Sequence, residues 1–200
     1  MTALTDLTFL SVDVETSSKV AGTGHLLSVG IVPVVHQDGK WVQLIEQGAA
    51  LYVRIEHPLG TDFRHHPNVD SVAWWSEQDP KSVKEAFDQS LLRFPPHTAA
   101  KMIHEHVRSL EDDPLRVIFA ANPVSFDKPW VDALIVKAGL ELPWHYRSMC
   151  LRSMKFGMDI SAGFGADRTT HPSAWPHHAL YDAIAQAHDL CDMLNSGGAR

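Results

Sequence analysis

Cysteine is scarce in this chain, because Cys150 and Cys191 are the only two among 200 residues. Two cysteines form no disulfide framework, and this pair does not supply a set of metal ligands. We therefore expect a reducing compartment, the cytoplasm. The beginning of the sequence lacks a basic stretch followed by an apolar run, so no signal peptide is expected. No segment approaches the roughly 20 apolar residues that span a bilayer, so no membrane partner is expected either.

Positive charge is also in short supply. Lysine and arginine together number 17 against 24 aspartates and glutamates, which gives a formal net charge of −7. A protein that coats nucleic acid through long-range attraction would carry the opposite balance. An enzyme that holds a few nucleotides through bound cations is compatible with this charge, because its site must be rich in carboxylates. With 13 histidines in the chain, a single histidine counts only where its position ties it to another group.

The first part of the chain has the pattern of β-structure. Residues 7–15 and 26–35 mix β-branched with apolar side chains and predict two buried strands. Pro33 indicates a bulge or an edge position in the second of them. Asp38-Gly39 is a hairpin-turn signal, and residues 41–55 supply one or two more strands. The chain is therefore expected to open with an antiparallel meander.

Helical patterns dominate the rest of the chain. A short apolar run at 116–121, bounded by prolines, predicts a further buried strand, and Gly139 suits the C-cap of the helix that follows it. This order predicts an α/β protein with a mixed central sheet, antiparallel on one side and parallel on the other, flanked by helices. We expect a single domain over 1–200, with an irregular stretch at 143–175 and a flexible tail at 194–200. Helices are expected at 69–75, 82–94, 97–110, 126–138 and 179–194.

Two carboxylates, Asp13 and Glu15, lie near the end of the first predicted strand. Side chains two residues apart on a strand point to the same face, so both emerge together beside the edge of the sheet. Buried acidic groups repel each other and lose solvation, and a divalent cation such as Mg²⁺ would stabilise them. The alternative is a strand that ends in a solvated acidic loop, and this pair alone does not decide between the two.

Two further aspartates lie where predicted helices begin. Asp127 follows the predicted strand at 116–121, and Asp182 lies in the first turns of the last helix. In either place an aspartate can simply cap a helix or interact with its dipole. If the strand at 116–121 lies beside the first strand, however, Asp127 points to the edge that carries Asp13 and Glu15. Their joint placement on neighbouring elements predicts a metal site.

Three segments carry a family resemblance. Ser11-Val-Asp-Val-Glu-Thr16, followed by Leu26-Leu-Ser-Val-Gly30, resembles the first motif of the DnaQ-like (DEDD) 3′→5′ exonucleases. Asn122-Pro-Val-Ser-Phe-Asp127 resembles the second motif, and His177-His-Ala-Leu-Tyr-Asp-Ala183 resembles the third in its histidine-bearing DEDDh form. The motifs occur in order, each attached to the right element, so the resemblance covers nearly the whole chain. The block Trp74-Trp-Ser-Glu-Gln78 resembles a feature of the family branch that contains phage exonuclease A and small bacterial exoribonucleases. RNase T and oligoribonuclease resemble this chain more distantly.

The resemblance implies an RNase H-like fold and two Mg²⁺ ions, with Mn²⁺ as a substitute, held by Asp13, Glu15, Asp127 and Asp182. One ion would activate the attacking water and the other would stabilise the leaving 3′ oxygen, so that Glu15 also takes part in catalysis. The implied substrate is the 3′ end of single-stranded RNA or DNA, hydrolysed at its phosphodiester bonds. Four carboxylates against two Mg²⁺ are formally neutral, which would let an acidic protein accept a polyanion.

The resemblance also implies a histidine general base, and two adjacent residues compete for this role. The family pattern favours His177, five residues before Asp182. Five residues on a continuous helix leave two side chains about 140° apart, so His177 must stand outside the helix to approach Asp182. Pro176 favours such a position. His178, four residues before Asp182, would share its face if it were helical. An imidazole can exchange a proton near neutral pH.

Candidates for substrate contact come from the same segments. Trp74 and Trp75 diverge by about 100° on a helix, so only one of them can face the core. The other could stack on a base, or it could cover a helix seam or a homodimer interface. Gln78, one turn further on, could reach a base or sugar edge. Thr16 and Leu27 are weaker pocket candidates from the first motif.

Two alternatives to an exonuclease are a catalytically idle nucleic-acid-binding protein of the same fold and a phosphodiesterase for a small nucleotide. The presence of all four carboxylates with the histidine speaks against the first. A preference for RNA or DNA depends on contacts to the 2′-OH, and no residue in the sequence indicates such a contact. Arg147 and Arg152, in the stretch before the last helix, are either phosphate contacts or solvated loop charges.

Overall fold

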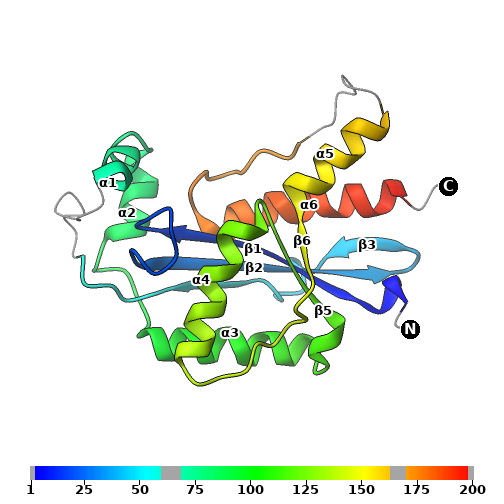
Figure 1. Cartoon of the computed structure of the whole chain (residues 1–200), viewed down its shortest axis with the longest axis horizontal. Coiled ribbons are helices and arrows are strands. Elements are labelled where there is room, and N and C mark those ends of the chain that lie inside the picture. Colours follow the sequence, from blue (N-terminus) through cyan, green and yellow to red (C-terminus); the bar gives the residue numbers. More distant parts are fainter. Residues whose placement is uncertain (1–2, 60–68, 163–169, 198–200) are drawn as a thin grey trace.

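The structure, a computed structural model, describes residues 3–59, 69–162 and 170–197. A mixed sheet of six strands forms its centre, with the order β3-β2-β1-β5-β6 and with β4 also paired to β2 (Figure 1). The strands are β1 (Thr8–Thr16), β2 (Leu26–Gln37), β3 (Lys40–Gln43), β4 (Leu51–Arg54), β5 (Val117–Ala121) and β6 (Ser148–Cys150).

The sheet has the two sides that the sequence predicts. β1 runs antiparallel to β2, whereas β5 runs parallel to β1 on its other edge, and β6 runs parallel to β5. The predicted α/β class with a mixed sheet is therefore confirmed. The opening strands differ from a simple meander, because β3 and β4 both pair with the long strand β2 instead of with each other.

Pro33 lies at an interruption along the edge of β2. β4 pairs with β2 as far as Ile31, and β3 begins to pair at Val34. The carbonyl of Pro33 accepts a hydrogen bond of 2.9 Å from the backbone N of Leu44, so this residue faces the interrupted edge. A proline has no N–H to offer to a neighbouring strand, which explains why it stands where the two partner strands leave a gap.

Helices cover both faces of the sheet (Figure 1). α3 and α4 pack on one face with Leu10 and Val12 of β1, and α6 packs on the other face with Phe9. The hydroxyl of Ser11 donates to the carbonyl of Ala183 in α6, at 2.9 Å. Odd-numbered residues of β1 therefore face α6. None of the described helices is long and apolar enough to cross a membrane. The helices are α1 (Val69–Ser76), α2 (Pro80–Phe87), α3 (Pro96–Leu110), α4 (Val124–Lys137), α5 (Leu151–Ala162) and α6 (Ala179–Gly197), with short 3₁₀ turns at Leu4–Asp6 and Pro114–Arg116.

Gly30 of β2 lets α6 begin very close to the sheet. It pairs with Asp13 of β1, so it lies on the face that α6 covers. A Cβ atom added at Gly30 would stand 2.3 Å from the carbonyl oxygen of Ala179, the first residue of α6. Only a residue without a side chain fits between this strand and the start of the helix.

We expect Gly30→Ala to destabilise the protein and to displace the beginning of α6. The added methyl group meets backbone, which cannot rotate away, and overpacking of this kind costs about 1–3 kcal/mol. Gly157→Ala is the matched control, because an added Cβ there meets nothing within 4 Å. That change should stabilise α5 by roughly 0.5–1 kcal/mol. Urea unfolding measures both, and equal stability of Gly30→Ala and the wild type would contradict the close contact.

α2 ends earlier than the sequence predicts, at Phe87 instead of Phe94. Beyond Phe87 the chain turns back toward the sheet, where Phe94 forms a parallel β-bridge with Ile55. The guanidinium of Arg93 donates to two carbonyls in the last turn of α2, at 2.8 and 3.0 Å. The long-range bridge and this arginine cap end the helix, and neither is visible as a local pattern.

The stretch at 143–175, predicted to be irregular, contains β6 and α5. β6 has only three residues. α5 leaves Phe156 and Ile160 exposed, so its sequence lacks the single apolar stripe that marks an amphipathic helix.

The last helix also differs from expectation at its end. α6 continues through Gly197, past Leu194, where the flexible tail was predicted to begin. The Asn195 side chain accepts a hydrogen bond from the backbone N of Trp41 at 2.8 Å and donates to its carbonyl at 3.1 Å. These two bonds join the last turn of α6 to β3 and extend the helix.

Candidate active site

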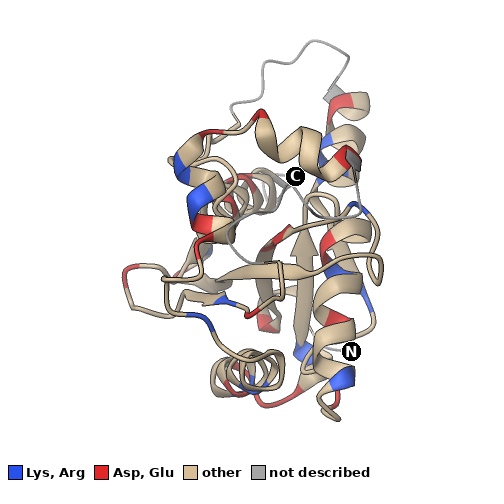
Figure 2. Ribbon diagram, turned by 90° about the vertical axis from the view of Figure 1, so that its left-hand side faces the viewer, with Lys and Arg blue, Asp and Glu red and all other residues tan. Residues whose placement is uncertain are grey.

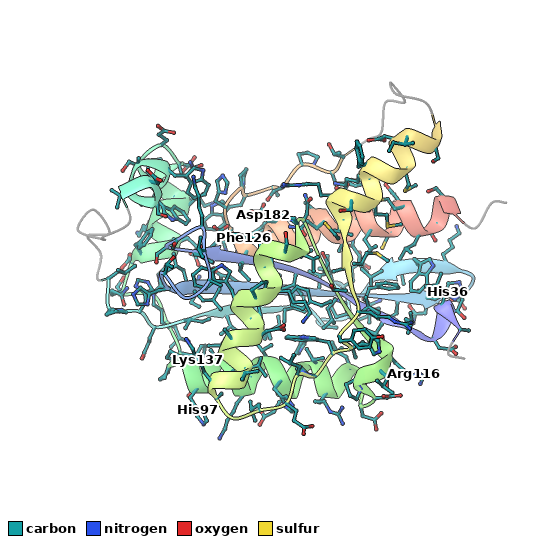
Figure 3. The ribbon with its side chains drawn as sticks, viewed as in Figure 1. His36, His97, Arg116, Phe126, Lys137 and Asp182 are labelled. Carbon is teal, nitrogen blue, oxygen red and sulfur yellow. The ribbon has the colours of Figure 1, made fainter. Side chains whose placement is uncertain are left out.

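The four predicted metal ligands line one cavity of about 570 Å³. Asp13 and Glu15 come from β1, Asp127 from the first turn of α4 and Asp182 from the first turn of α6. In Figure 3, Asp182 lies beside Phe126, another lining residue, where the beginnings of α4 and α6 approach the sheet. The structure therefore brings together four carboxylates that are up to 169 positions apart in the sequence.

Asp127 owes its position to the parallel pairing of β5 with β1. The chain leaves β5 at Ala121 and enters α4 at Val124, beside the end of β1. The carboxylate of Asp127 then accepts a hydrogen bond of 3.1 Å from the backbone N of Val14. Because Val14 lies between Asp13 and Glu15, this bond ties the third carboxylate directly to the first two.

Burial and mutual repulsion make it costly to ionise these carboxylates. Burial, followed by the charges of its acidic neighbours, raises the pKa of Asp13 well above its ordinary value. The same causes raise the pKa of Glu15. Burial raises the pKa of Asp127 to about 7, and it also raises the pKa of Asp182. Divalent cations would relieve this repulsion, and oxygen donors suit Mg²⁺ and Mn²⁺. The donor set fits such ions.

His177 stands outside α6, as the spacing to Asp182 requires. Its backbone is left-handed, with φ +61, and α6 begins two residues later. The backbone N of His177 donates to a carboxylate oxygen of Asp182 at 2.8 Å. A ring nitrogen of His177 and one carboxylate oxygen each of Glu15 and Asp182 lie within 4.8 Å of one another. His177 therefore lines the carboxylate cavity.

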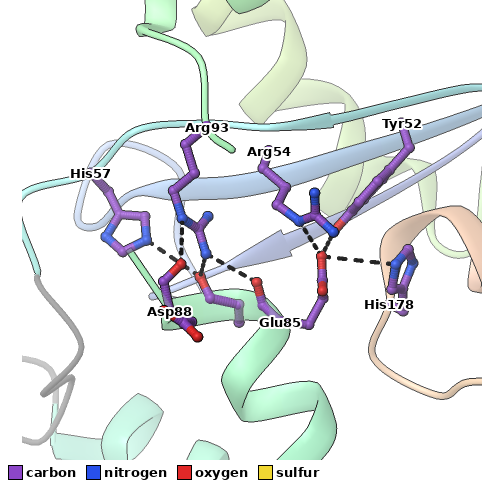
Figure 4. Close-up of polar contacts among 8 residues, drawn as sticks. Tyr52, Arg54, His57, Glu85, Asp88, Arg93 and His178 are labelled. Carbon is purple, nitrogen blue, oxygen red and sulfur yellow. Dashed lines mark hydrogen bonds and ion pairs between the residues drawn. The ribbon is translucent and has the colours of Figure 1, made fainter. Parts of the chain in front are cut away.

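His178 is buried and does not line the carboxylate cavity, and Figure 4 shows it beside Glu85. Its ring lies between those of Tyr52 and Trp175, with centroids 4.4 and 4.5 Å away. Its Nε2 is 3.9 Å from a carboxylate oxygen of Glu85, which also accepts hydrogen bonds from Tyr52 and Arg54. Burial lowers the pKa of His178, which favours its neutral form. The turn at His177 therefore directs two adjacent histidines into different surroundings.

Among the candidates for substrate contact, Thr16, Trp74 and Trp75 line the cavity. Trp75 is almost fully buried and donates through its indole N–H to the carbonyl of Thr16 at 3.0 Å. Trp74 is half-buried, and its ring centroid is 4.8 Å from that of His177. Only one tryptophan of the pair thus faces the core, as predicted, and homodimerisation through the pair stays a prediction.

Leu27 and Gln78 are not among the residues that line the cavity. Leu27 is completely buried and packs in the same apolar cluster as Trp75. Gln78 donates through its side-chain amide to the carbonyl of Trp74 at 2.8 Å, so it holds the end of α1. Leu27 therefore belongs to the apolar packing of Trp75, and Gln78 holds the backbone of Trp74.

Gln186 is a site residue that the sequence did not reveal. It is mostly buried, it lines the cavity, and its amide donates to a carboxylate oxygen of Asp13 at 2.7 Å. The side-chain oxygen of Gln186 is also buried, and it has no hydrogen-bond partner among the described residues. Gln186 lies four residues after Asp182 on α6, so helical spacing from the third motif is the signal that could have identified it.

We expect Gln186→Ala to weaken Mn²⁺ binding about tenfold, because groups that orient metal ligands typically contribute a factor of this size. Without the amide, Asp13 loses its only side-chain hydrogen bond among the described residues. Gln37→Ala, an exposed position at the end of β2, removes the same side chain at a remote place and should bind Mn²⁺ like the wild type. Calorimetric titration measures both, and unchanged affinity in Gln186→Ala would contradict this role.

Basic and acidic residues alternate over the part of the chain that the structure describes. Figure 2 shows Lys and Arg interspersed with Asp and Glu along the helices. Of the described residues that line the cavity, Lys19 and Lys155 are the only lysines or arginines. The local charge of the cavity is therefore negative, in keeping with a site for cations.

Comparisons with solved structures place the fold among nucleases. Cell-death related nuclease 4 matches 95% of this chain and 64% of its own, with a TM-score of 0.63 and 16% identity. Exonuclease I matches 95% of this chain and 41% of its own, with a TM-score of 0.66 and 14% identity. The zinc-bound complex of E. coli exonuclease I with single-stranded DNA matches 97% of this chain and 41% of its own, with a TM-score of 0.64 and 14% identity. The chain thus spans about two fifths of the length of exonuclease I, and the likeness shows the fold.

The sequence itself matches a family. No individual curated protein matches the chain. Residues 8–193, from the beginning of β1 almost to the end of α6, match the family described as the 3′-5′ exoribonuclease Rv2179c-like domain. This match confirms the predicted class of 3′→5′ exonucleases, and the chain belongs to the 3′-5′ exoribonuclease Rv2179c-like family.

Proposed function

We propose that this chain is a metal-dependent enzyme that removes nucleotides from the 3′ end of single-stranded nucleic acid, with RNA as the preferred substrate. The observation that carries the proposal is a set of four carboxylates, crowded into one cavity beside His177. Such a cluster is unfavourable on its own and is suited to divalent cations and a phosphodiester. The description of the family as exoribonucleases supports RNA, and single-stranded DNA in the exonuclease I complex supports an unpaired strand.

Asp13, Glu15, Asp127 and Asp182 would hold two divalent cations, Mg²⁺ or Mn²⁺. When bound, the cations supply activation of the attacking water and stabilisation of the leaving 3′ oxygen. The carboxylates fix where the positive charge lies, and Gln186 orients Asp13 through its amide. With two such ions, the four carboxylates are formally neutral, so the cavity can accept the negative phosphate.

His177 is proposed to take the proton from the attacking water. Its ring reaches the same small volume as the carboxylates of Glu15 and Asp182. The hydrogen bond from the backbone N of His177 to Asp182 fixes the backbone at this residue, and the ring of Trp74 packs against the imidazole. As a general base, His177 would then return the proton to solvent before the next cycle.

Trp74 is proposed to support the base of the terminal nucleotide. Its ring lines the cavity and is half-buried, so one part remains open to a ligand. Stacking on an aromatic side chain contributes roughly 1–3 kcal/mol per base and tolerates any base. Such a contact would allow degradation of a strand irrespective of its sequence.

The direct test follows one strand labelled either at its 3′ or at its 5′ end, as RNA and as DNA, in Mg²⁺, in Mn²⁺ and in chelator. We expect a labelled mononucleotide to appear first from the 3′-labelled strand, only with metal, and faster from RNA. Binding of the strand without cleavage under any metal would favour an idle binding protein. Cleavage of small nucleotides but not of strands would favour a small-nucleotide phosphodiesterase.

A further inference from the structure

α5 contributes Lys155 to the lining of the carboxylate cavity and carries Arg152 one turn earlier. Lys155 lines the cavity itself. Arg152 precedes it by three residues, so the two lie on the same side of the helix. Arg152 is exposed. The side of α5 that carries both residues therefore faces the site.

A buried carboxylate holds Lys155 in place. The ammonium group of Lys155 pairs with Asp189 of α6, which is only 7% exposed. The second oxygen of Asp189 accepts a hydrogen bond of 2.9 Å from the backbone N of His171. An ammonium group has three donors, and Asp189 uses one of them. The Lys155 side chain remains 25% exposed, so the other donors are available to a ligand in the cavity.

The polarity of the reaction determines which phosphate such a cation could meet. The terminal nucleotide of a strand that is shortened from its 3′ end carries a free hydroxyl, so the scissile phosphate is the last one. Any second phosphate in the cavity must therefore lie on the 5′ side. The charge of the proposed divalent cations is balanced by the four carboxylates. A second phosphate therefore needs a positively charged side chain as its partner.

We propose that α5 binds the strand on the 5′ side of the scissile bond, with Lys155 holding the next phosphate and Asp189 positioning Lys155. The inference rests on the proposed exonuclease function and deepens it. Phe156 extends the same surface, because it lies four residues after Arg152 and the residue is 58% exposed. A ring beside two cations suits the base and the phosphate of an unpaired strand.

The test measures how binding of a short single strand depends on salt, by fluorescence anisotropy in Mg²⁺, with a cleavage-resistant phosphorothioate at the last linkage. Each phosphate neutralised on a single strand contributes about 0.7 to the slope of log K against log salt. We expect Lys155→Ala to reduce that slope by about 0.7 and to weaken binding about tenfold at low salt. Lys155→Arg, which keeps the charge, should restore the slope.

Lys101→Ala on α3 is the matched control, because it removes an exposed lysine from the face of the sheet opposite α6. A salt slope in Lys155→Ala equal to that of Lys101→Ala and of the wild type would overturn the inference. A second comparison uses the p-nitrophenyl ester of a nucleoside 5′-monophosphate, which has only the scissile phosphate. In Lys155→Ala the ratio of kcat/KM for the strand to that for the ester should fall about tenfold. An unchanged ratio would also contradict the assignment.

These measurements separate the inference from the proposed function. If the wild type releases no nucleotide from the strand and does not cleave the ester, the proposed exonuclease function is wrong. If the wild type is active and Lys155→Ala behaves like Lys101→Ala, only the role of Lys155 is wrong. Thermal unfolding of each variant shows whether it is folded, and Lys155→Gln, which is also neutral, replaces the alanine variant if that variant is not folded.

Discussion

Replacing His177 with alanine is expected to lower kcat by about two to four orders of magnitude, the range typical of a lost general base. The ring of His177 is the imidazole that reaches the carboxylates of Glu15 and Asp182. KM for the strand should change much less, because the proposed metal ligands and the proposed base contact of Trp74 remain. Release of nucleotide from a 3′-labelled strand under saturating conditions measures the effect.

His178→Ala is the matched comparison, since it removes the same side chain one residue away. The ring of His178 packs against Tyr52 and Trp175 and is only 5% exposed, so its loss should lower thermal stability. Turnover of the fraction that remains folded should stay within about tenfold of the wild type. The reverse pattern, in which His178→Ala abolishes turnover and His177→Ala keeps it, would overturn the assignment of the base.

Asp127→Asn is expected to inactivate the enzyme and, at the same time, to stabilise the metal-free protein. Asparagine can still accept the hydrogen bond from Val14 but carries no charge. It therefore removes a buried carboxylate whose ionisation opposes folding, while it also removes one ligand of the proposed cations. Opposite changes in activity and stability are diagnostic of a residue kept for function.

The stabilisation by Asp127→Asn should depend on pH in a defined direction. Burial raises the pKa of Asp127 to about 7 in the folded protein, from an ordinary value of 3.8. The contribution of this group to stability is therefore fully present below pH 3.8 and is lost as the pH rises through about 7. The variant does not lose it, so in chelator its melting temperature should exceed that of the wild type at pH 8 and approach it at pH 5.

Asp112→Asn, an exposed position between α3 and β5, removes a remote carboxylate and should leave both melting curves and activity unchanged. Divalent metal should raise the melting temperature of the wild type more than that of Asp127→Asn. If Asp127→Asn destabilised the metal-free protein at pH 8, the account of a repulsive buried cluster would be contradicted.

The sequence predicted most of the sheet, because a buried strand is a continuous run of β-branched and apolar residues. The alternation around Leu10 and Val12 and the long apolar run of β2 both appear in the residue order. The order of the elements predicted a parallel side of the sheet, but the position of β5 beside β1 was only a condition for Asp127 to reach the first motif. α5 was missed because its apolar residues point to solvent as well as to the core, which leaves no stripe to recognise.

For the site, the sequence predicted the four carboxylates and two competing histidines, but it did not predict Gln186 or the pairing of Lys155 with Asp189. Asp13 and Glu15 share a face by the period of a strand, and the competition between His177 and His178 could be posed but not decided by spacing. The left-handed turn at His177 separates them, and that conformation has no local signature in a histidine. Lys155 and Asp189 are 34 positions apart in the sequence, so only the packing of α5 on α6 reveals their pairing.

The most direct test of the central claim is a count of the Mn²⁺ ions that the metal-free protein binds. Two divalent cations held by Asp13, Glu15, Asp127 and Asp182 predict two Mn²⁺ per chain in an equilibrium titration followed by electron paramagnetic resonance. A variant with both Asp13→Asn and Asp182→Asn should bind one or none at the same concentration. Failure of the wild type to bind Mn²⁺, or equal binding by the double variant, would contradict the claim that these carboxylates form the metal site.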